Sequence, residues 1–91
     1  MSQLGAQKPH ELRPYRRLPK QVRTQVDATI ALFEENPRHP SLQIKKMKGT
    51  ENIWEGRVTR SYRFTFEWDG EVVTFRRVGT HDILEKEARR E

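Results

Sequence analysis

The 91-residue sequence contains no cysteine. This absence excludes a disulfide framework and any metal site built on thiolates. The sequence also lacks an apolar run of about 18 residues, as a membrane-spanning helix requires, and residues 1–10 lack the apolar stretch of a secretory signal. A small domain that folds without disulfides is typical of the cytoplasm, so we expect a cytoplasmic protein.

Apolar residues are scarce, at 33% of the chain, whereas charged residues make up 34%. The length suffices for one domain, whose small core must depend on a few large side chains. Residues 1–10 contain Gly, Pro, Ser and Gln without any periodicity. We therefore predict a flexible N-terminal arm at 1–10 and a single domain at 11–91.

Positive charge exceeds negative charge, with a net charge of +5 and a pI of about 10.0. The excess lies in residues 1–50, which carry +6, whereas residues 51–91 carry −1. A basic balance favours a polyanionic partner, either a nucleic acid or an acidic protein surface. A basic surface that only keeps the protein soluble is the alternative.

The first half of the chain is predicted to be helical. A short helix is expected at 11–18, and a longer one begins at Pro19, which suits a first helical turn. Apolar residues in the longer helix recur every three or four positions, and Asn36-Pro37 ends it. The residues of this stripe are Val22, Val26, Ile30 and Phe33.

The second half is predicted to form strands and a short closing helix. Asp69-Gly70 is a strong hairpin signal between two of the strands. The fold class is therefore α+β, with N-terminal helices packed on a three- to four-stranded antiparallel sheet. The predicted strands are 42–47, 53–60, 62–68 and 71–78, and the closing helix is 82–90.

Alternation along 62–68 predicts which side chains share a face of the sheet. Four aromatic side chains should point into the core, which places Arg63 on the opposite face. Arg57 and either Arg76 or Arg77 are expected opposite it on the neighbouring strands, with Lys45, Lys46 and Lys48 at the border. Arginines clustered in this way favour a bound anion. Cross-strand ion pairs with Glu55, Glu67 and Glu71 are an equally open interpretation.

The three histidines differ in their surroundings. His10 falls in the predicted arm and His39 lies between two prolines, so both are expected to be solvated surface residues. His81 follows the last strand at the start of a helix, where anions are favoured. The histidine spacing gives no metal-binding motif. No phosphate-binding glycine loop is present, and nothing supports a serine nucleophile.

Several short motifs, in their order along the chain, resemble those of the RelE/ParE superfamily of type II toxin–antitoxin toxins. The resemblance is to the RelE branch of this superfamily. The resemblance covers about residues 18–84. It rests on Leu18-Pro19, Asn36-Pro37, His39-Pro40-Ser41-Leu42, Lys46-Met47-Lys48-Gly49, Trp54 with Arg57-Val58, Tyr62-Arg63-Phe64 and Val78-Gly79-Thr80-His81-Asp82.

This resemblance implies a prokaryotic mRNA interferase, a ribosome-dependent endoribonuclease that inhibits translation. Its reaction would be a metal-independent transesterification without a cofactor, in which the ribose 2′-OH attacks the adjacent phosphate. The implied partners are mRNA, the ribosome with its 16S rRNA, and an acidic antitoxin. The implied catalytic residues are Arg63, His81 and Arg57, and the implied RNA-binding residues are Lys45, Lys46, Lys48, Arg76 and Arg77.

Two departures from the family pattern keep other interpretations open. Members with a His-Asp pair often carry an aromatic residue four positions later, where this chain has Glu85. This favours a degenerate relative that only binds antitoxin or RNA. The usual first strand also lacks a counterpart, which predicts an uncovered sheet edge that an antitoxin strand pairs with. A ParE-like inhibitor of DNA gyrase is the remaining alternative, although it would not need Arg63 and His81.

Overall fold

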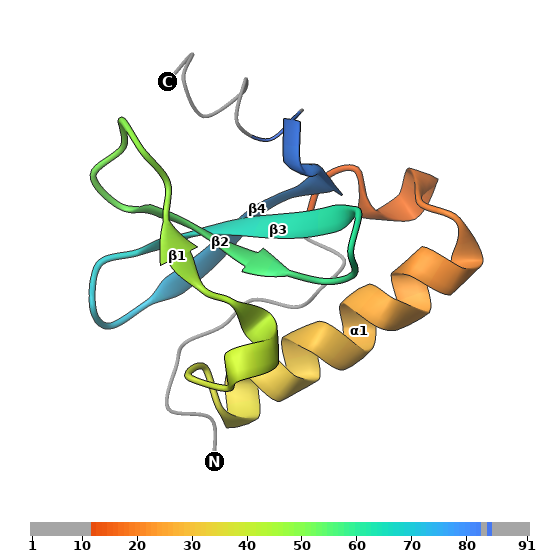
Figure 1. The fold of residues 1–91 in the computed structure, drawn as a ribbon, viewed down its shortest axis with the longest axis horizontal. Helices are drawn as coiled ribbons and strands as arrows, with labels where there is room; N and C mark the ends of the chain where they lie inside the picture. Colours follow the sequence, from red (N-terminus) through yellow and green to blue (C-terminus); the bar gives the residue numbers. More distant parts are fainter. Residues whose placement is uncertain (1–11, 83, 85–91) are drawn as a thin grey trace.

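The computed structural model describes residues 12–82 and Leu84. The predicted arm, Glu85 and most of the predicted closing helix lie outside these residues. Within them, four strands form one antiparallel sheet in the order β1-β2-β3-β4, and helix α1 runs along it (Figure 1). The predicted α+β class is confirmed. The elements are η2 (Tyr15–Arg17), α1 (Lys20–Glu35), η3 (Pro40–Leu42), β1 (Lys45–Lys46), β2 (Ile53–Arg57), β3 (Tyr62–Trp68) and β4 (Val73–Thr80).

Helix α1 covers one side of the core, as its apolar stripe predicts. Val26, Ile30 and Phe33 are buried, and the helix ends where Asn36 donates its N–H to the Leu32 carbonyl at 2.7 Å. The Phe33 ring lies 4.9–6.1 Å, between centroids, from three rings of the sheet. Such edge and tilted contacts suit aromatic rings, so one helical residue fixes α1 on the sheet. The three rings belong to Phe64, Phe66 and Phe75.

The β3–β4 hairpin departs from its predicted bounds at both ends of β4. The Asp69 carboxylate accepts the N–H groups of Val72 at 3.0 Å and Glu71 at 2.9 Å, so these residues belong to the turn. Both hydrogen bonds favour the ionised carboxylate and lower the pKa of Asp69. At the other end, Gly79 does not stop the strand, because it pairs with Arg63 and β4 continues to Thr80.

The strands before this hairpin are shorter than predicted. Leu42 lies in the turn η3 instead of an extended strand, and Gln43 has a left-handed backbone with φ of 46°. Pairing in β1 is therefore limited to two residues. β2 stops at Arg57 because Thr59 begins a turn, in which its hydroxyl accepts the N–H of Tyr62 at 3.1 Å.

The chain before α1 covers part of the sheet edge that we expected to be open. Arg13 runs parallel to β4: its N–H donates to the Arg76 carbonyl at 3.1 Å, and its carbonyl accepts the Val78 N–H at 2.8 Å. Leu12 is 1% exposed and joins the core. The predicted short helix is reduced to η2, and the prediction of a bare edge is wrong at this position. Among residues 12–19, this pairing is a single bridge at Arg13.

At Gly56, side chains of the core pack directly against the backbone of β2. A Cβ atom at this position would lie 2.8 Å from Ile44 Cδ1 and closer still to the Phe64 ring. We expect Gly56→Ala to lower the free energy of unfolding by about 1–3 kcal/mol through overpacking. Urea unfolding followed by tryptophan fluorescence measures the loss. Gly49→Ala has open space around its Cβ but a φ of +78°, so its cost comes from the backbone alone. A loss for Gly56→Ala below 0.5 kcal/mol would contradict the predicted overlap.

Candidate functional site

The face of the sheet turned away from α1 carries the predicted catalytic side chains. Arg57 on β2 pairs with Arg63 on β3, and Arg63 pairs with Gly79 on β4. Phe64 and Phe66 point to the helix side and are fully buried, so Arg63 faces the other way. The prediction that Arg63 lies opposite the aromatic core is confirmed. The prediction that Arg76 or Arg77 lies opposite it is wrong, because Gly79 occupies that position.

A bulge in β4 shifts the register of this part of the hairpin by one residue. Phe66 pairs with Phe75, whereas Thr65 pairs with Arg77, so Arg76 is an additional residue between them. A bulge moves every later side chain by one position relative to a regular strand. Arg77 consequently lies one cross-strand pair away from Arg63, beside Thr65.

Arg63 is held in place by the turn that precedes its own strand. Its Nη1 donates to the carbonyl oxygens of Thr59 at 2.5 Å, Arg60 at 3.2 Å and Tyr62 at 3.1 Å. Arg57 and Arg63 are both half-buried and lie directly opposite each other. Like charges in this position are unfavourable, and an anion between the two guanidinium groups would relieve the repulsion.

His81 lies on the same side of the sheet and reaches across β3. Its Nδ1 is 3.4 Å from Oε2 of Glu55, which belongs to β2. The other carboxylate oxygen of Glu55, Oε1, is 3.2 Å from Nζ of Lys45 on β1. The Glu55 side chain is 3% exposed, whereas those of Lys45 and His81 are 63% and 38% exposed. A buried carboxylate thus lies between a lysine of β1 and the imidazole of His81.

This role of Glu55 was not predicted from the sequence, which indicated only that Glu55 could be one of three ion-pair partners for arginines. Its signal in the sequence is weak, because alternation places Glu55 and Arg57 on one face without showing what covers them. Glu55 is 2% exposed, and the structure brings His81, the residue that follows β4, to within 3.4 Å of its carboxylate. The contact joins residues 26 positions apart in the sequence.

The predicted RNA-binding residues lie on or next to the two outer strands of the sheet. Lys45 and Lys46 form the exposed edge strand β1, and Lys48 is exposed in the turn that follows. Arg76 and Arg77 are half-buried on β4. The two groups flank the sheet on opposite sides, since β1 and β4 are its outer strands.

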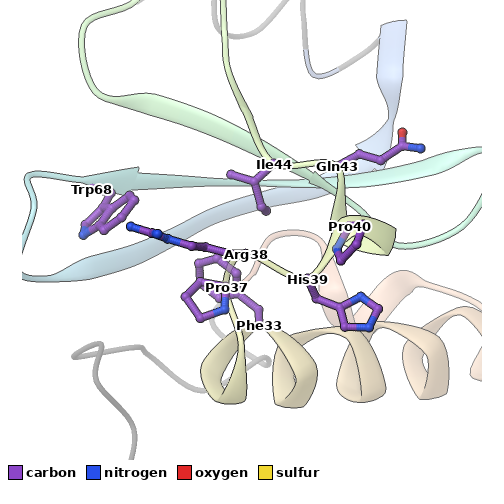
Figure 2. A pocket seen from close by; sticks show the side chains of 8 residues that line it. All are labelled: Phe33, Pro37, Arg38, His39, Pro40, Gln43, Ile44 and Trp68. Carbon is purple, nitrogen blue, oxygen red and sulfur yellow. The ribbon is translucent and has the colours of Figure 1, made fainter.

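A separate hollow of about 440 Å³ lies on the helix side of the sheet. Figure 2 shows its apolar wall and the Arg38 side chain, which extends across it toward Trp68. Arg57, Arg63 and His81 do not line it. The predicted catalytic group therefore lies outside this hollow, on the face of the sheet turned away from α1. The lining residues are Phe33, Pro37, Arg38, His39, Pro40, Gln43, Ile44 and Trp68.

Solved structures with the same fold are toxins of toxin–antitoxin systems. RelE from the RelB–RelE complex of Methanococcus jannaschii is 23% identical, with a TM-score of 0.65 over 87% of this chain and 92% of that chain. YafQ in the Escherichia coli DinJ–YafQ complex is 14% identical, with a TM-score of 0.68 over 90% and 97%. The E. coli RelBE complex gives 24% identity and a TM-score of 0.58 over 88% and 96%. Neither a protein-family model nor a curated protein sequence matches the chain.

These comparisons confirm the resemblance inferred from the sequence at the level of the fold. The chain has the RelE-like fold, and the match extends over nearly the whole of each toxin. Among the described residues, none of the helices is long and apolar enough to cross a membrane.

Proposed function

We propose that this protein is the toxin of a type II toxin–antitoxin system and an mRNA interferase that cuts mRNA on the ribosome. The observation that carries the proposal is the placement of Arg57, Arg63 and His81 on one face of a RelE-like sheet. The group combines two arginines, one of them held by backbone carbonyls, with an imidazole, the set that a reacting phosphodiester requires.

In the proposed reaction, the ribose 2′-oxygen forms a bond to the adjacent phosphorus while the bond from phosphorus to the 5′-oxygen breaks. A base takes the 2′-OH proton and an acid protonates the leaving 5′-oxygen, which leaves a 2′,3′-cyclic phosphate and a 5′-hydroxyl. Arg63 and Arg57 stabilise the additional negative charge on the phosphate oxygens. His81 exchanges one of the two protons. The step needs neither a metal nor a cofactor.

The remaining cations serve binding in this proposal. Lys45, Lys46 and Lys48 on one flank, with Arg76 and Arg77 on the other, contact the backbones of mRNA and 16S rRNA. An acidic antitoxin neutralises the same surface, in keeping with the net charge of +5. We place the reaction in the cytoplasm of a prokaryotic cell, where mRNA, ribosomes and antitoxin meet.

Induced expression of the wild-type protein tests the proposal. We expect growth arrest and mRNA cuts within codons, mapped by primer extension, that disappear when translation of the reporter is blocked by a mutated start codon. His81→Gln should restore growth and reduce the cuts by about 100-fold or more, because a general acid or base is lost. His39→Gln, which changes a histidine on the other side of the sheet, is the matched control and should stay toxic.

Other outcomes would point to the alternatives. Growth arrest with intact mRNA and inhibited gyrase supercoiling would indicate a ParE-like toxin. A folded wild-type protein that neither arrests growth nor cuts mRNA would indicate a relative that only binds antitoxin or RNA.

A further inference from the structure

Glu55 is the buried acid among the described residues of this sheet, with 2% of its surface exposed. Burial of a carboxylate is unfavourable unless charged or hydrogen-bonding partners compensate for it. Lys45 compensates from one side, at 3.2 Å from Oε1. This contact leaves Oε2 directed at His81, whose Nδ1 is 3.4 Å away. The carboxylate therefore connects the edge strand β1 with the segment that follows β4.

The orientation of the His81 ring follows from the same contact. Its Nδ1 atom is buried, although 38% of the side chain is exposed. The ring thus turns Nδ1 toward Glu55 and its opposite edge, which carries Nε2, toward the open face. A carboxylate accepts hydrogen bonds and does not donate them when ionised, so it favours the form of imidazole with a proton on Nδ1.

We infer that Glu55 is a positioning residue, which fixes the proton of His81 on Nδ1 and leaves Nε2 as the atom that exchanges a proton with RNA. The inference rests on the proposed function and deepens it, because it applies whether His81 acts as acid or as base. As a base, Nε2 offers its lone pair to the 2′-OH. As an acid, Nε2 of the imidazolium gives its proton to the 5′-oxygen, and the neutral ring that remains keeps its Nδ1 proton.

The charged groups that the four described strands place on this face, apart from Glu55 and Glu67, are cations. Lys45 on β1, Arg57 on β2, Arg63 on β3 and Arg77 on β4 all belong to the same face. None of these cations accepts a hydrogen bond from an imidazole N–H. Asp82 follows His81 directly and is exposed. Glu55 is thus the buried acceptor that the structure places beside Nδ1.

The protein supplies its own internal reference for the proton position. The Nδ1 atom of His39 accepts the backbone N–H of Ser41 at 3.2 Å, so the neutral His39 ring carries its proton on Nε2. Long-range proton–nitrogen NMR spectra of the ¹⁵N-labelled wild-type protein, at a pH where imidazole is neutral, should therefore show opposite tautomers for His39 and His81. The spectrum of His81→Gln assigns the His81 signals.

Substitution of Glu55 connects the tautomer with the reaction. Glu55→Met removes the acceptor, so the His81 signals should move toward the tautomer mixture of free imidazole, and cleavage should fall by about 10-fold or more. Glu55→Gln keeps an acceptor oxygen and should retain more activity than Glu55→Met. Glu67→Met makes the same change at an exposed residue of this face and should alter neither measurement. Thermal melts establish that each variant is folded.

Failure of the inference differs from failure of the proposed function. Unchanged His81 nitrogen shifts in folded Glu55→Met would overturn the inference even if wild-type protein cuts mRNA. A shifted tautomer with wild-type cleavage rates would also overturn it, because the proton position would then be irrelevant to the reaction. A wild-type protein with the Nδ1-protonated ring that leaves translated mRNA intact refutes the proposed function, and with it a positioning role in that reaction.

Discussion

Arg63→Ala should lower the rate of mRNA cleavage by about 100- to 1,000-fold and abolish toxicity. Removal of one well-placed donor to a developing oxyanion costs this much in other enzymes. Three carbonyl groups hold the Arg63 guanidinium before any substrate arrives, so little reorganisation is needed when the phosphate binds. Single-turnover cleavage of mRNA on programmed ribosomes measures the effect. Growth after induction provides the cellular readout.

Two other substitutions separate the effect of the Arg63 guanidinium geometry from that of positive charge near the site. Arg60→Ala removes an exposed cation from the adjacent turn and should leave cleavage within about threefold of wild type. Arg63→Lys keeps the charge but loses the planar fork, so its activity should lie between those of wild type and Arg63→Ala. Folded Arg63→Ala protein that cuts mRNA at the wild-type rate would remove Arg63 from the proposed mechanism.

The sequence was sufficient to predict the face on which Arg63 lies. Residues 62–68 alternate without interruption, and period-2 alternation has only two possible assignments. The aromatic members determine which one is correct, since Phe64 and Phe66 are both fully buried. The stripe of α1 was predictable for a similar reason, because Val26, Ile30 and Phe33 recur at helical spacing and are buried.

The position of the β4 arginines was not predictable in this way. Arg76 and Arg77 are adjacent, so either can face the sheet surface once a bulge is permitted. Local sequence contains no signal that chooses between them. The choice depends on how Phe75 and Val78 both reach the core, since the additional residue lets two apolar side chains separated by three positions point the same way.

Glu55 shows a second limit of prediction from sequence, because its surroundings depend on residues that are distant from it in the chain. A glutamate in a strand normally faces solvent, and nothing near residue 55 indicates burial. Glu55 is nevertheless 2% exposed, and its carboxylate lies 3.4 Å from His81, which follows the last strand. The single bridge at Arg13 arose in the same manner, because its partners on β4 are more than 60 positions away in the sequence.

Phe33→Ala should destabilise the fold more than any other substitution considered for this protein, by about 3–5 kcal/mol. Phe33 is 1% exposed and contacts three aromatic rings of the sheet. Truncation leaves a cavity between α1 and β3 that a core of this size cannot close. A domain of this kind is stable by only about 5–15 kcal/mol, so the variant should be partly unfolded at 37 °C. Equilibrium urea unfolding measures the loss.

Phe33→Leu and Val72→Ala are the control variants for Phe33→Ala. Leucine refills most of the volume, so Phe33→Leu should lose less stability than Phe33→Ala. Val72 is 47% exposed in the hairpin turn, and its truncation should change stability by no more than about 0.5 kcal/mol. Because Phe33 lies on the helix side and Arg63 on the opposite face, Phe33→Leu should keep the cleavage rate of wild type at temperatures where it is folded. A folded Phe33→Leu variant with a much reduced rate would mean that packing of α1 determines the geometry of the opposite face.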